Sequence, residues 1–488
     1  MNASSHFCST LRRLAPLARA FPLHAKEARL RPLFDPPEFH RTLVAAISRA
    51  KGRISLCALY LGTGDLEKEL VACIDKTLSV RPAVRVRLVF DGSRARRKSR
   101  ISGISTLSLL LPLLRKHGPD RLSLHLCSMP TAQKAEGLPP MLGEIAGVFH
   151  AKAYVVDNEL IISGANLSDE YFRNRQDRYL HIGKGPEIAD WYHNMIKTLG
   201  DCGKTVTIPS KINSKFEFTT KSPKCPVREW RKALESLVKP VNTTIGLAES
   251  LPFPSEGKPP DTYIFPTIQC GPIGMDHDTT VLDAVLDSVP VHGSVRLATA
   301  YLNPPSRFVE KLAAAAPYGE VSILTAHRDS HGFRGAKGLM SYVVDCYMRI
   351  ESDLRPLFRS ARTTLSSKDL VPCPLYIGAY RRPGWTYHAK GLWVRASHKV
   401  PCFLSVAGSS NFGRRSFDRD LETQMVILSN EPNLRYAFEE EWSRLSRFIN
   451  DSTSSSCNDT ATLDSATRSN KNTRPLARLL SVIFGGFL

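Results

Sequence analysis

The chain has 488 residues, a hydrophobic fraction of 42% and a formal net charge of +20 at pH 7. This length allows roughly two to four domains with cores that need no covalent staples. The 11 cysteines show neither a C-x-x-C pair nor a zinc spacing, which argues against a disulfide framework and a structural metal site. The excess of lysine and arginine suits a polyanionic partner (nucleic acid, an anionic membrane or a phosphorylated substrate), or simply a soluble surface.

The amino-terminal stretch is basic, and its first acidic residue is Glu27. Its cationic residues alternate with hydrophobic ones, as in an amphipathic mitochondrial transit peptide; they are Arg12, Arg13, Arg19 and Lys26. We therefore predict a transit peptide over residues 1–27, with a flexible basic terminus as the alternative.

Two stretches of the chain follow the same order of elements. Residues 53–74 begin as a β-rich run and continue as a helical pattern, and residues 84–92 form another apolar strand. Residues 294–316 and 320–326 repeat this order. Strand–helix–strand order predicts two similar α/β lobes, each with a mostly parallel sheet flanked by helices.

Shifts in composition divide the chain further. We place the first lobe at 28–204, an inter-lobe segment rich in Pro, Lys and Ser at 205–266, and the second lobe at 267–449. Residues 450–473 are polar and lack aromatics, which predicts a disordered linker. The amphipathic tail at 474–488 suits either a membrane interface or docking on the core. No stretch reaches the roughly 18 apolar residues of a membrane-spanning helix.

Each half carries a His-Ala-Lys triplet at the head of an apolar run. The first triplet holds His150 and Lys152, and the second holds His388 and Lys390. The side chains of residues i and i+2 of a strand project to the same side, so the histidine and the lysine of each triplet face the same side. An anion between them would offset the cost of burying a lysine.

The repeat continues beyond these runs. Asn166 follows Ser-Gly-Ala and Asn411 follows Gly-Ser-Ser, and Asp177 and Glu422 stand at the same distance after each asparagine (177 − 166 = 422 − 411 = 11). The matched spacing indicates an internal duplication.

Paired imidazoles, lysines and asparagines suit displacement at a phosphodiester. One imidazole attacks phosphorus to give a phosphohistidine, while the other, protonated, donates to the leaving oxygen and then activates the acceptor hydroxyl. The lysines and asparagines surround the non-bridging oxygens. Asp177 and Glu422 can fix the tautomer and orientation of the histidines. This chemistry needs no metal or other cofactor, although stimulation by divalent ions stays open.

These residues resemble the phospholipase D superfamily, whose signature is H-x-K-x4-D followed by a small-residue turn with asparagine. His150, Lys152 and Asp157 match it, whereas Arg395 stands at the second Asp position. The superfamily Asp is mainly structural, but we keep Asp157 among the catalytic candidates. The resemblance implies a pseudo-two-fold pair of lobes with both histidines in one shared active site. In the second half it rests on His388, Lys390, Ser409, Asn411 and Glu422.

Longer strings such as "HGFRGAKG" and "GWTYHAKGLW" are similar to the eukaryotic mitochondrial phosphatidylglycerophosphate synthase family, from about Pro32 to Arg447. This resemblance implies phosphatidyl transfer from CDP-diacylglycerol to sn-glycerol 3-phosphate, with release of CMP, on the way to phosphatidylglycerol and cardiolipin. It also implies a peripheral enzyme on the anionic surface of the mitochondrial inner membrane, with no nucleic-acid partner. The oligomeric state stays open.

Three further assignments are hypotheses. The basic run 94–100 and Lys337 are candidates for holding a diphosphate, glycerophosphate or anionic lipid, with solvated loops as the alternative. A glycine loop could present backbone amides to a nucleotide phosphate, although a tight turn explains it equally well. We favour His150 as the nucleophile, because its half keeps the whole motif, and His388 as the general acid. The glycine loop proposed to contact a nucleotide phosphate consists of Tyr60, Leu61, Gly62, Thr63 and Gly64.

Other functions compete with this interpretation. A nucleic-acid phosphodiesterase would also suit the basic charge and the twin motifs, but no aromatic stacking platform is interleaved with the basic runs. A phosphatidylserine or cardiolipin synthase is a second alternative, since the acceptor alcohol decides among them. A non-catalytic, membrane-binding duplicate is the third, and the intact His, Lys and Asn of both halves argue against it.

Overall fold

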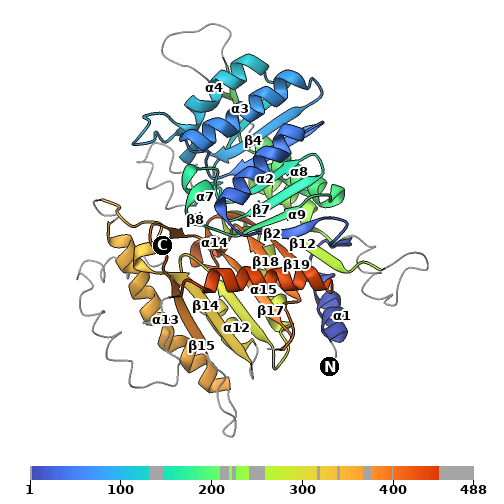
Figure 1. Ribbon diagram of the computed structural model, residues 1–488, viewed down its shortest axis with the longest axis vertical. Helices are drawn as coiled ribbons and strands as arrows, with labels where there is room; N and C mark the ends of the chain where they lie inside the picture. The colour runs from blue at the N-terminus through green and yellow to red at the C-terminus, as the bar shows by residue number, and fades with distance from the viewer. Residues whose placement is uncertain are drawn as a thin grey trace.

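The chain builds two lobes, each on one large sheet, and Figure 1 shows the amino-terminal lobe above the second. This arrangement confirms the predicted α/β class with two similar lobes. The computed structural model describes residues 3–130, 147–208, 219–221, 227–240, 259–315, 319–337, 341–365, 375–397 and 399–449. The predicted linker and tail, 450–473 and 474–488, lie outside the described residues.

The sheet of the first lobe has the strand order β11-β10-β5-β4-β3-β6-β7-β9-β2. Its strands are β2 (Leu30–Leu33), β3 (Arg53–Ala58), β4 (Arg85–Asp91), β5 (Leu122–Cys127), β6 (Ala153–Val156), β7 (Glu159–Ser163), β9 (Tyr179–Ile182), β10 (Lys204–Thr207) and β11 (Thr219–Lys221). The helices of this lobe are α2 (Pro36–Arg49), α3 (Asp65–Val80), η1 (Arg94–Arg96), α4 (Thr106–His117), α7 (Asp169–Arg173) and α8 (Pro186–Asp201).

The sheet of the second lobe has the order β1-β12-β19-β18-β17-β13-β14-β15. Its strands are β1 (Phe21–Leu23), β12 (Thr262–Cys270), β13 (Ser294–Ala298), β14 (Glu320–Ala326), β15 (Leu375–Tyr380), β17 (Gly391–Arg395), β18 (Leu404–Gly408) and β19 (Leu421–Ser429). The remaining helices are α1 (Ala3–Leu14), α9 (Val227–Val238), η2 (Gly271–Ile273), α11 (His277–Asp287), α12 (Ser306–Ala314), η3 (Arg328–Ser330), α13 (Val343–Leu365), α14 (Arg414–Asp418) and α15 (Pro432–Ser446).

Most strand pairs in both sheets are antiparallel, which corrects the expectation of mostly parallel sheets. Within the described strands of the two large sheets, parallel pairing is limited to β3–β4–β5 and β13–β14–β15. The chain returns between these strands through crossovers that contain helices, as parallel pairing requires. Elsewhere short connections join neighbours, such as the turn at 157–158 between β6 and β7, and these produce antiparallel hairpins.

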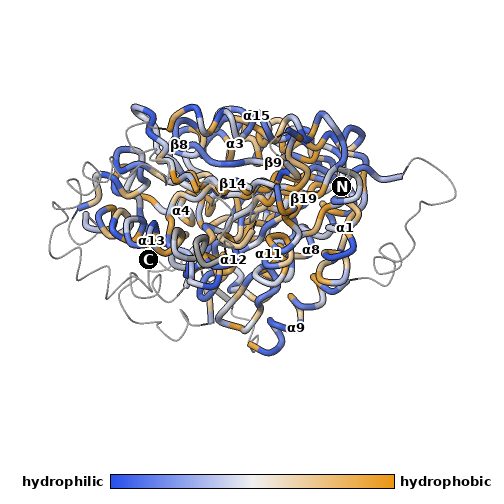
Figure 2. Tube along the Cα trace, turned by 90° about the horizontal axis from the view of Figure 1, so that it is seen from below, coloured by the Kyte–Doolittle hydropathy of each residue, from blue (hydrophilic) through white to orange (hydrophobic). Residues whose placement is uncertain are grey.

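Among the residues that the structure describes, three hydrophobic cores fix the layers. One joins the first sheet to α2, α3 and α4, and another joins the second sheet to α1, α11 and α12. The third lies between the two sheets and takes side chains from α8, α9 and α15, among them Trp191, Trp230 and Trp442. In Figure 2 the hydrophobic colour follows inner strands such as β19, and helix α15 is largely hydrophilic. The shared core fixes the position of one lobe relative to the other.

The segment predicted to be a transit peptide is packed into the fold. Helix α1 buries Phe7, Leu11 and Leu14 in the core of the second lobe, and β1 pairs with β12. The chain then crosses to the first lobe, where β2 pairs with β9. The amphipathic pattern that suggests a transit peptide is also that of a helix with one face in a core. Cleavage near residue 27 stays a prediction.

The segment predicted to separate the lobes is divided between them. Strands β10 and β11 extend the first sheet, β12 starts the second sheet at Thr262, and α9 packs Trp230 and Leu234 into the core between the sheets. Among the helices that the structure describes, none combines the length and the hydropathy of a membrane-spanning segment.

Candidate active site

The two His-Ala-Lys triplets occupy corresponding places, immediately before β6 and β17. The backbone N–H of His150 donates to the carbonyl of Leu421 (2.9 Å), and that of His388 donates to the carbonyl of Gln176 (2.7 Å). Phe149 forms a bridge with Leu421, and the two-stranded pair of β8 (Arg175–Gln176) and β16 (Thr386–Tyr387) is its counterpart. Each histidine is therefore bound to the opposite half of the chain, next to the acid of that half.

The two acids contact the histidines crosswise. Nδ1 of His150 lies 2.9 Å from Oε2 of Glu422, and Nδ1 of His388 lies 2.6 Å from Oδ2 of Asp177. Both acids are buried. An ionised carboxylate only accepts hydrogen bonds, so in the state in which both acids are ionised each Nδ1 carries a proton and each Nε2 keeps its lone pair. The sequence predicts both acids as orienting groups, but not that each acts on the histidine of the other half.

The lysines of the two triplets are fully buried and make the same contact. Lys152 Nζ donates to the carbonyl of His150, and Lys390 Nζ donates to the carbonyl of His388, each at 2.7 Å. Lys390 Nζ also lies 2.6 Å from Nδ1 of His388 and 3.5 Å from Oδ2 of Asp177. Burial lowers the pKa of Lys152 to about 7 and that of Lys390 to about 8. An anion bound beside either lysine would raise these pKa values again.

Burial also shifts the pKa values of the histidines and their acids. It lowers the pKa of His150 and of His388 well below 6.5, and the adjacent lysine lowers each further. It raises the pKa of Asp177 to about 6 and that of Glu422 to about 7. His150 itself contributes to the lowered pKa of His388, so the two imidazoles interact electrostatically across the lobe interface. An incoming phosphate would favour protonation of either imidazole.

The paired asparagines leave polar atoms unsatisfied at the same place. Asn166 follows β7 and Asn411 follows β18, and the Oδ1 atom of each is buried without a hydrogen-bond partner. Buried polar atoms are normally paired, so two orphans at equivalent positions point to groups that serve a ligand.

The turns before the asparagines differ between the halves. Ser409 Oγ donates to Glu422 at 2.5 Å. Gly164 stands at the corresponding place in the first half, where an added Cβ would lie 2.7 Å from both Lys390 Nζ and Asp177 Oδ1. The close approach of this ion pair explains the glycine, whereas Ser409 contacts the acid of its own half.

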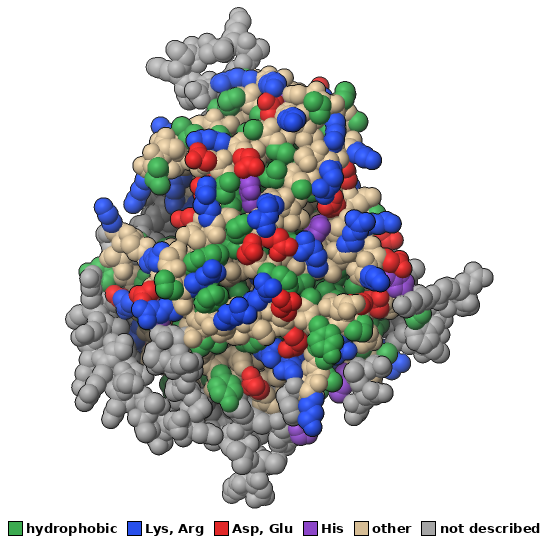
Figure 3. Space-filling model, in the orientation of Figure 1, with side chains coloured by type: hydrophobic (Ala, Val, Ile, Leu, Met, Phe, Trp, Pro, Cys, Tyr) green, Lys and Arg blue, Asp and Glu red, His purple; other side chains and the backbone are tan. Residues whose placement is uncertain are grey.

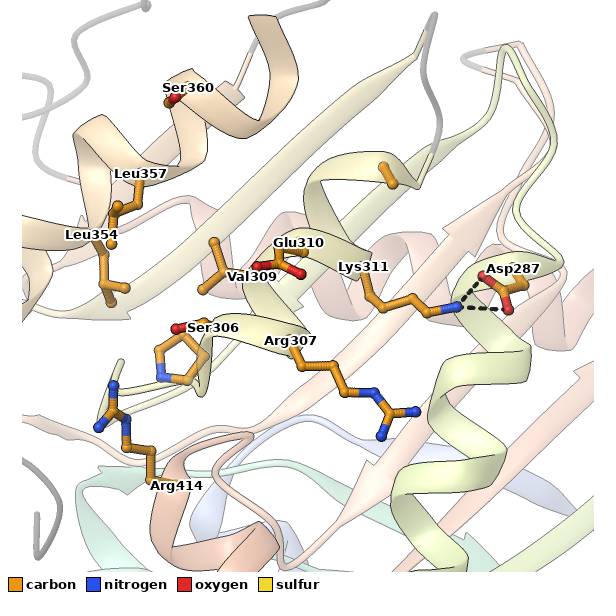
Figure 4. A pocket seen from close by; sticks show the side chains of 12 residues that line it. Asp287, Ser306, Arg307, Val309, Glu310, Lys311, Leu354, Leu357, Ser360 and Arg414 are labelled. Carbon is orange, nitrogen blue, oxygen red and sulfur yellow. Dashed lines mark hydrogen bonds and ion pairs between the residues drawn. The ribbon is translucent and has the colours of Figure 1, made fainter. Parts of the chain in front are cut away.

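The imidazoles are nearly enclosed, with His150 9% and His388 4% exposed. A separate cavity of about 710 Å³ lies on the second lobe between α12 and α13 (Figure 4). Its cationic side chains Arg307 and Lys311 are paired with carboxylates of α11, and Arg414 lies at one side. The site histidines do not line this cavity.

Asp157, one of the predicted catalytic residues, makes structural contacts in the described part of the chain. It occupies the β6–β7 turn with φ 51°, and its carboxylate accepts the backbone N–H groups of Lys51, Gly52 and Arg53 at 2.7–2.9 Å. The whole of β6 separates it from His150. Its place in the signature therefore reflects bracing of the strand that carries the triplet.

Arg395 braces the corresponding hairpin of the second half by a different bond. Its Nε donates to the carbonyl of Val400 at 3.0 Å, across the connection between β17 and β18. Loss of the acid at this position therefore leaves the histidine and lysine of the second triplet in place.

The predicted phosphate loop, residues 60–64, is occupied by the protein's own carboxylates. The Asp169 carboxylate accepts the N–H of Leu66 at 3.0 Å near the amino end of α3, and Glu67 accepts the N–H of Asp169 at 2.8 Å. A Cβ at Gly62 would collide with Glu67. These glycines allow close packing of the turn against Glu67, and the geometry does not support a nucleotide contact at this helix end.

The other predicted anion-binding groups lie on the surface. Lys337 is exposed, and the basic run 94–100 forms η1 and the loop after it, where Arg94 stacks on Tyr60 at 4.9 Å. On the face shown in Figure 3, lysine and arginine are spread among acidic side chains. Both anion-binding hypotheses stay predictions.

A buried arginine next to Asp177 was missed from the sequence. Arg178 crosses from the first lobe into the second, where its guanidinium pairs with Glu441 at 2.8 Å and lies 3.9 Å from the ring centroid of Trp393. Its Nη2 also donates to Ser405. This contact holds the segment that carries Asp177 against the second lobe. The only sequence signal is its adjacency to the predicted acid.

Within the described ranges, no group of three or more His, Cys, Asp or Glu side chains is placed to hold a metal ion.

Comparisons with known proteins relate the chain to lipid enzymes. Residues 43–199 match the family model described as "Cardiolipin synthase, PLD-like domain". The chain is 32% identical over 446 residues to "CDP-diacylglycerol--glycerol-3-phosphate 3-phosphatidyltransferase, mitochondrial" of Gallus gallus, which covers 85% of this chain and 77% of the relative. The human protein of that name gives 32% over 445 residues, with the same coverage. The Saccharomyces cerevisiae transferase gives 28% over 457 residues, covering 88% and 84%.

A solved structure has the same fold. The phosphatidylserine synthase of Haemophilus influenzae aligns with a TM-score of 0.68 over 99% of this chain and 100% of that one, at 19% identity. This likeness supports the two-lobed architecture.

Proposed function

The chain belongs to the CDP-diacylglycerol–glycerol-3-phosphate 3-phosphatidyltransferase family, and we propose that it transfers the phosphatidyl group of CDP-diacylglycerol to sn-glycerol 3-phosphate. The products would be phosphatidylglycerophosphate and CMP. One observation carries this proposal to a mechanism: His150 and His388 come from different halves, and each is oriented by the acid of the other half.

The first half-reaction forms a phosphohistidine. Nε2 of His150 attacks the phosphorus of the phosphatidyl group, and the bond to the CMP oxygen breaks. His388, protonated when the anionic substrate binds, donates its Nε2 proton to the leaving oxygen. Glu422 holds the Nδ1–H of His150, so that Nε2 presents its lone pair to phosphorus.

The second half-reaction reverses these roles. His388, now neutral, accepts the proton of the glycerol 3-phosphate hydroxyl, whose oxygen attacks phosphorus and breaks the bond to His150. Lys152, Lys390, Asn166 and Asn411 would contact the non-bridging oxygens, where negative charge concentrates in the transition state. The asparagines would donate through Nδ2, because an amide oxygen only accepts hydrogen bonds and cannot bind a phosphate oxygen.

The surroundings of the two imidazoles support His150 as the nucleophile. Nε2 of His388 contacts the hydroxyl of Tyr171 at 3.2 Å and Nζ of Lys390 at 3.4 Å. Within the described part of the chain, no side chain hydrogen-bonds Nε2 of His150, whose contact is through Nδ1 alone. The free nitrogen suits attack on phosphorus, and the hydrogen-bonded one suits proton transfer.

We place the protein at the surface of the mitochondrial inner membrane, in the pathway to cardiolipin. Several relatives carry the word "mitochondrial" in their names, and this supports a mitochondrial location. The net charge of +20 supports attraction to anionic lipid. The donor and the product are both anionic phospholipids, so a peripheral enzyme would meet them at that surface.

The experiment is an acceptor panel with purified protein and CDP-diacylglycerol labelled in the phosphatidyl group. We expect label in phosphatidylglycerophosphate with glycerol 3-phosphate, and far less transfer to serine or phosphatidylglycerol. Preferential transfer to serine or phosphatidylglycerol would favour the synthase alternatives, and cleavage of single-stranded DNA without lipid transfer would favour the nuclease. We also propose that no metal is required, since imidazole and lysine supply the nucleophile, acid and charge; activity should survive chelation by EDTA.

A further inference from the structure

Tyr171 of the first lobe is held against the histidine of the second. Its hydroxyl lies 3.2 Å from Nε2 of His388, and the two rings meet edge to face with centroids 5.1 Å apart. The tyrosine is buried on helix α7. The guanidinium of Arg175 lies 4.9 Å from its ring centroid and pairs with Glu170 at 2.6 Å. The ring therefore has a fixed place in the site.

The direction of this hydrogen bond follows from the partners. Nδ1 of His388 lies 2.6 Å from both Oδ2 of Asp177 and Nζ of Lys390, and when Nδ1 donates to the carboxylate, Nε2 is the acceptor. Burial raises the pKa of Tyr171 well above 10, and the hydroxyl stays protonated and donates. In the second half-reaction of the proposed function, Nε2 must accept the proton of the attacking hydroxyl. Tyr171 thus occupies the position that the acceptor hydroxyl has to take.

The duplicated half has a different residue at this place. Its residue at the corresponding place, five positions after Asn411 as Tyr171 is after Asn166, is Ser416. The Ser416 hydroxyl donates to Glu422 at 2.8 Å, so it supports the acid and not the imidazole. The two halves therefore differ at one position in what they present to the reacting nitrogen, and the difference lies beside the histidine proposed as the acid and base.

We propose that Tyr171 is a positioning residue that covers Nε2 of His388 until the acceptor alcohol displaces it, and thereby keeps water from the phosphatidyl-enzyme. This inference rests on the proposed function. If water took that place, its oxygen would bond to phosphorus, the bond to His150 would break, and its proton would pass to His388, releasing phosphatidic acid. The acceptor uses the same steps with its own hydroxyl. Tyr171 would thus favour transfer over hydrolysis.

The test is the product ratio of Tyr171→Phe, which keeps the ring and removes the hydroxyl. With labelled CDP-diacylglycerol and subsaturating glycerol 3-phosphate, the ratio of phosphatidic acid to phosphatidylglycerophosphate should rise roughly fivefold or more, as expected for loss of one hydrogen bond. Tyr387→Phe is the matched control, because its buried hydroxyl has no hydrogen-bond partner; its ratio should equal that of the wild type. An unchanged ratio in Tyr171→Phe overturns the proposal, and so does loss of both products in a folded variant.

A second measurement needs no variant. Without acceptor, the wild-type protein should release about one equivalent of CMP per active site and then stop, because the phosphatidyl-enzyme is protected from water. Continued CMP release at the rate seen with acceptor would overturn the inference. The proposed function fails separately, if the wild-type protein forms no phosphatidylglycerophosphate at all.

Discussion

Oε2 of Glu422 lies 2.9 Å from Nδ1 of His150, although 272 positions separate the two residues in the sequence. The counterpart contact, between Asp177 and His388, joins the halves in the opposite direction. Neither half therefore contains a complete imidazole–carboxylate pair. The duplication makes one site from two lobes, and the core shared between the sheets holds the two imidazole–carboxylate pairs in place.

The crossed contact predicts the effect of removing one acid. Glu422→Gln should lower kcat by roughly 10²–10⁴-fold, the range expected when the group that orients a catalytic histidine is lost. Asp278→Asn is the control, since Asp278 is also a buried carboxyl but contacts Thr267 and Gln424 instead of an imidazole. Steady-state kinetics of both variants would decide. A loss in Asp278→Asn as large as that in Glu422→Gln would contradict the specific role.

The shifted pKa values predict a bell-shaped pH dependence of kcat/KM. Activity should rise as Asp177 and Glu422 lose protons, with pKa values of about 6 and about 7, because the ionised acids hold Nδ1–H of each histidine. It should fall as Lys152 and Lys390 lose protons, with pKa values of about 7 and about 8. At saturating donor, the phosphates should move the basic limb of kcat to higher pH. A flat profile over this interval would contradict the assignment.

Asp157 should matter for stability and not for chemistry. Asp157→Ala removes the acceptor of three backbone N–H groups and should lower the free energy of unfolding by about 1–3 kcal/mol. Asp157→Asn should cost less, because asparagine tolerates the positive φ and keeps one acceptor oxygen. Denaturant unfolding and kcat per folded molecule separate the two effects. A large drop in kcat at unchanged stability would return Asp157 to the catalytic residues.

The amino-terminal helix should be part of the folded protein. Leu14 is fully buried, and Leu14→Ala should lower the free energy of unfolding by about 2–4 kcal/mol. Arg12→Ala, at an exposed position of the same helix, should change it by less than about 0.5 kcal/mol. Equal and small effects would show that α1 contributes little, as expected of a removable transit peptide.

The sequence identifies the triplets, the asparagines and the acids because the duplication repeats each of them at matched spacing. It also predicts the order of strands and helices, since their periodicities are local. It does not reveal that Glu422 serves His150, because that pairing depends on how two lobes pack. Tyr171 and Arg178 are not identified from the sequence, because the residues at the corresponding positions of the other half differ and no repeat marks them. The predicted parallel direction of the strands is wrong where short hairpins, and not helix-containing crossovers, connect neighbouring strands.

The central claim is that both imidazoles act on one phosphorus, with His150 as the nucleophile. The most direct measurement is to quench the protein during turnover of labelled CDP-diacylglycerol and to locate the label by peptide mass spectrometry. We expect an acid-labile adduct on His150 in the wild type, and none in His150→Ala. Label on His388 would reverse the two roles, and an active enzyme with no histidine adduct under any quench would contradict the double displacement.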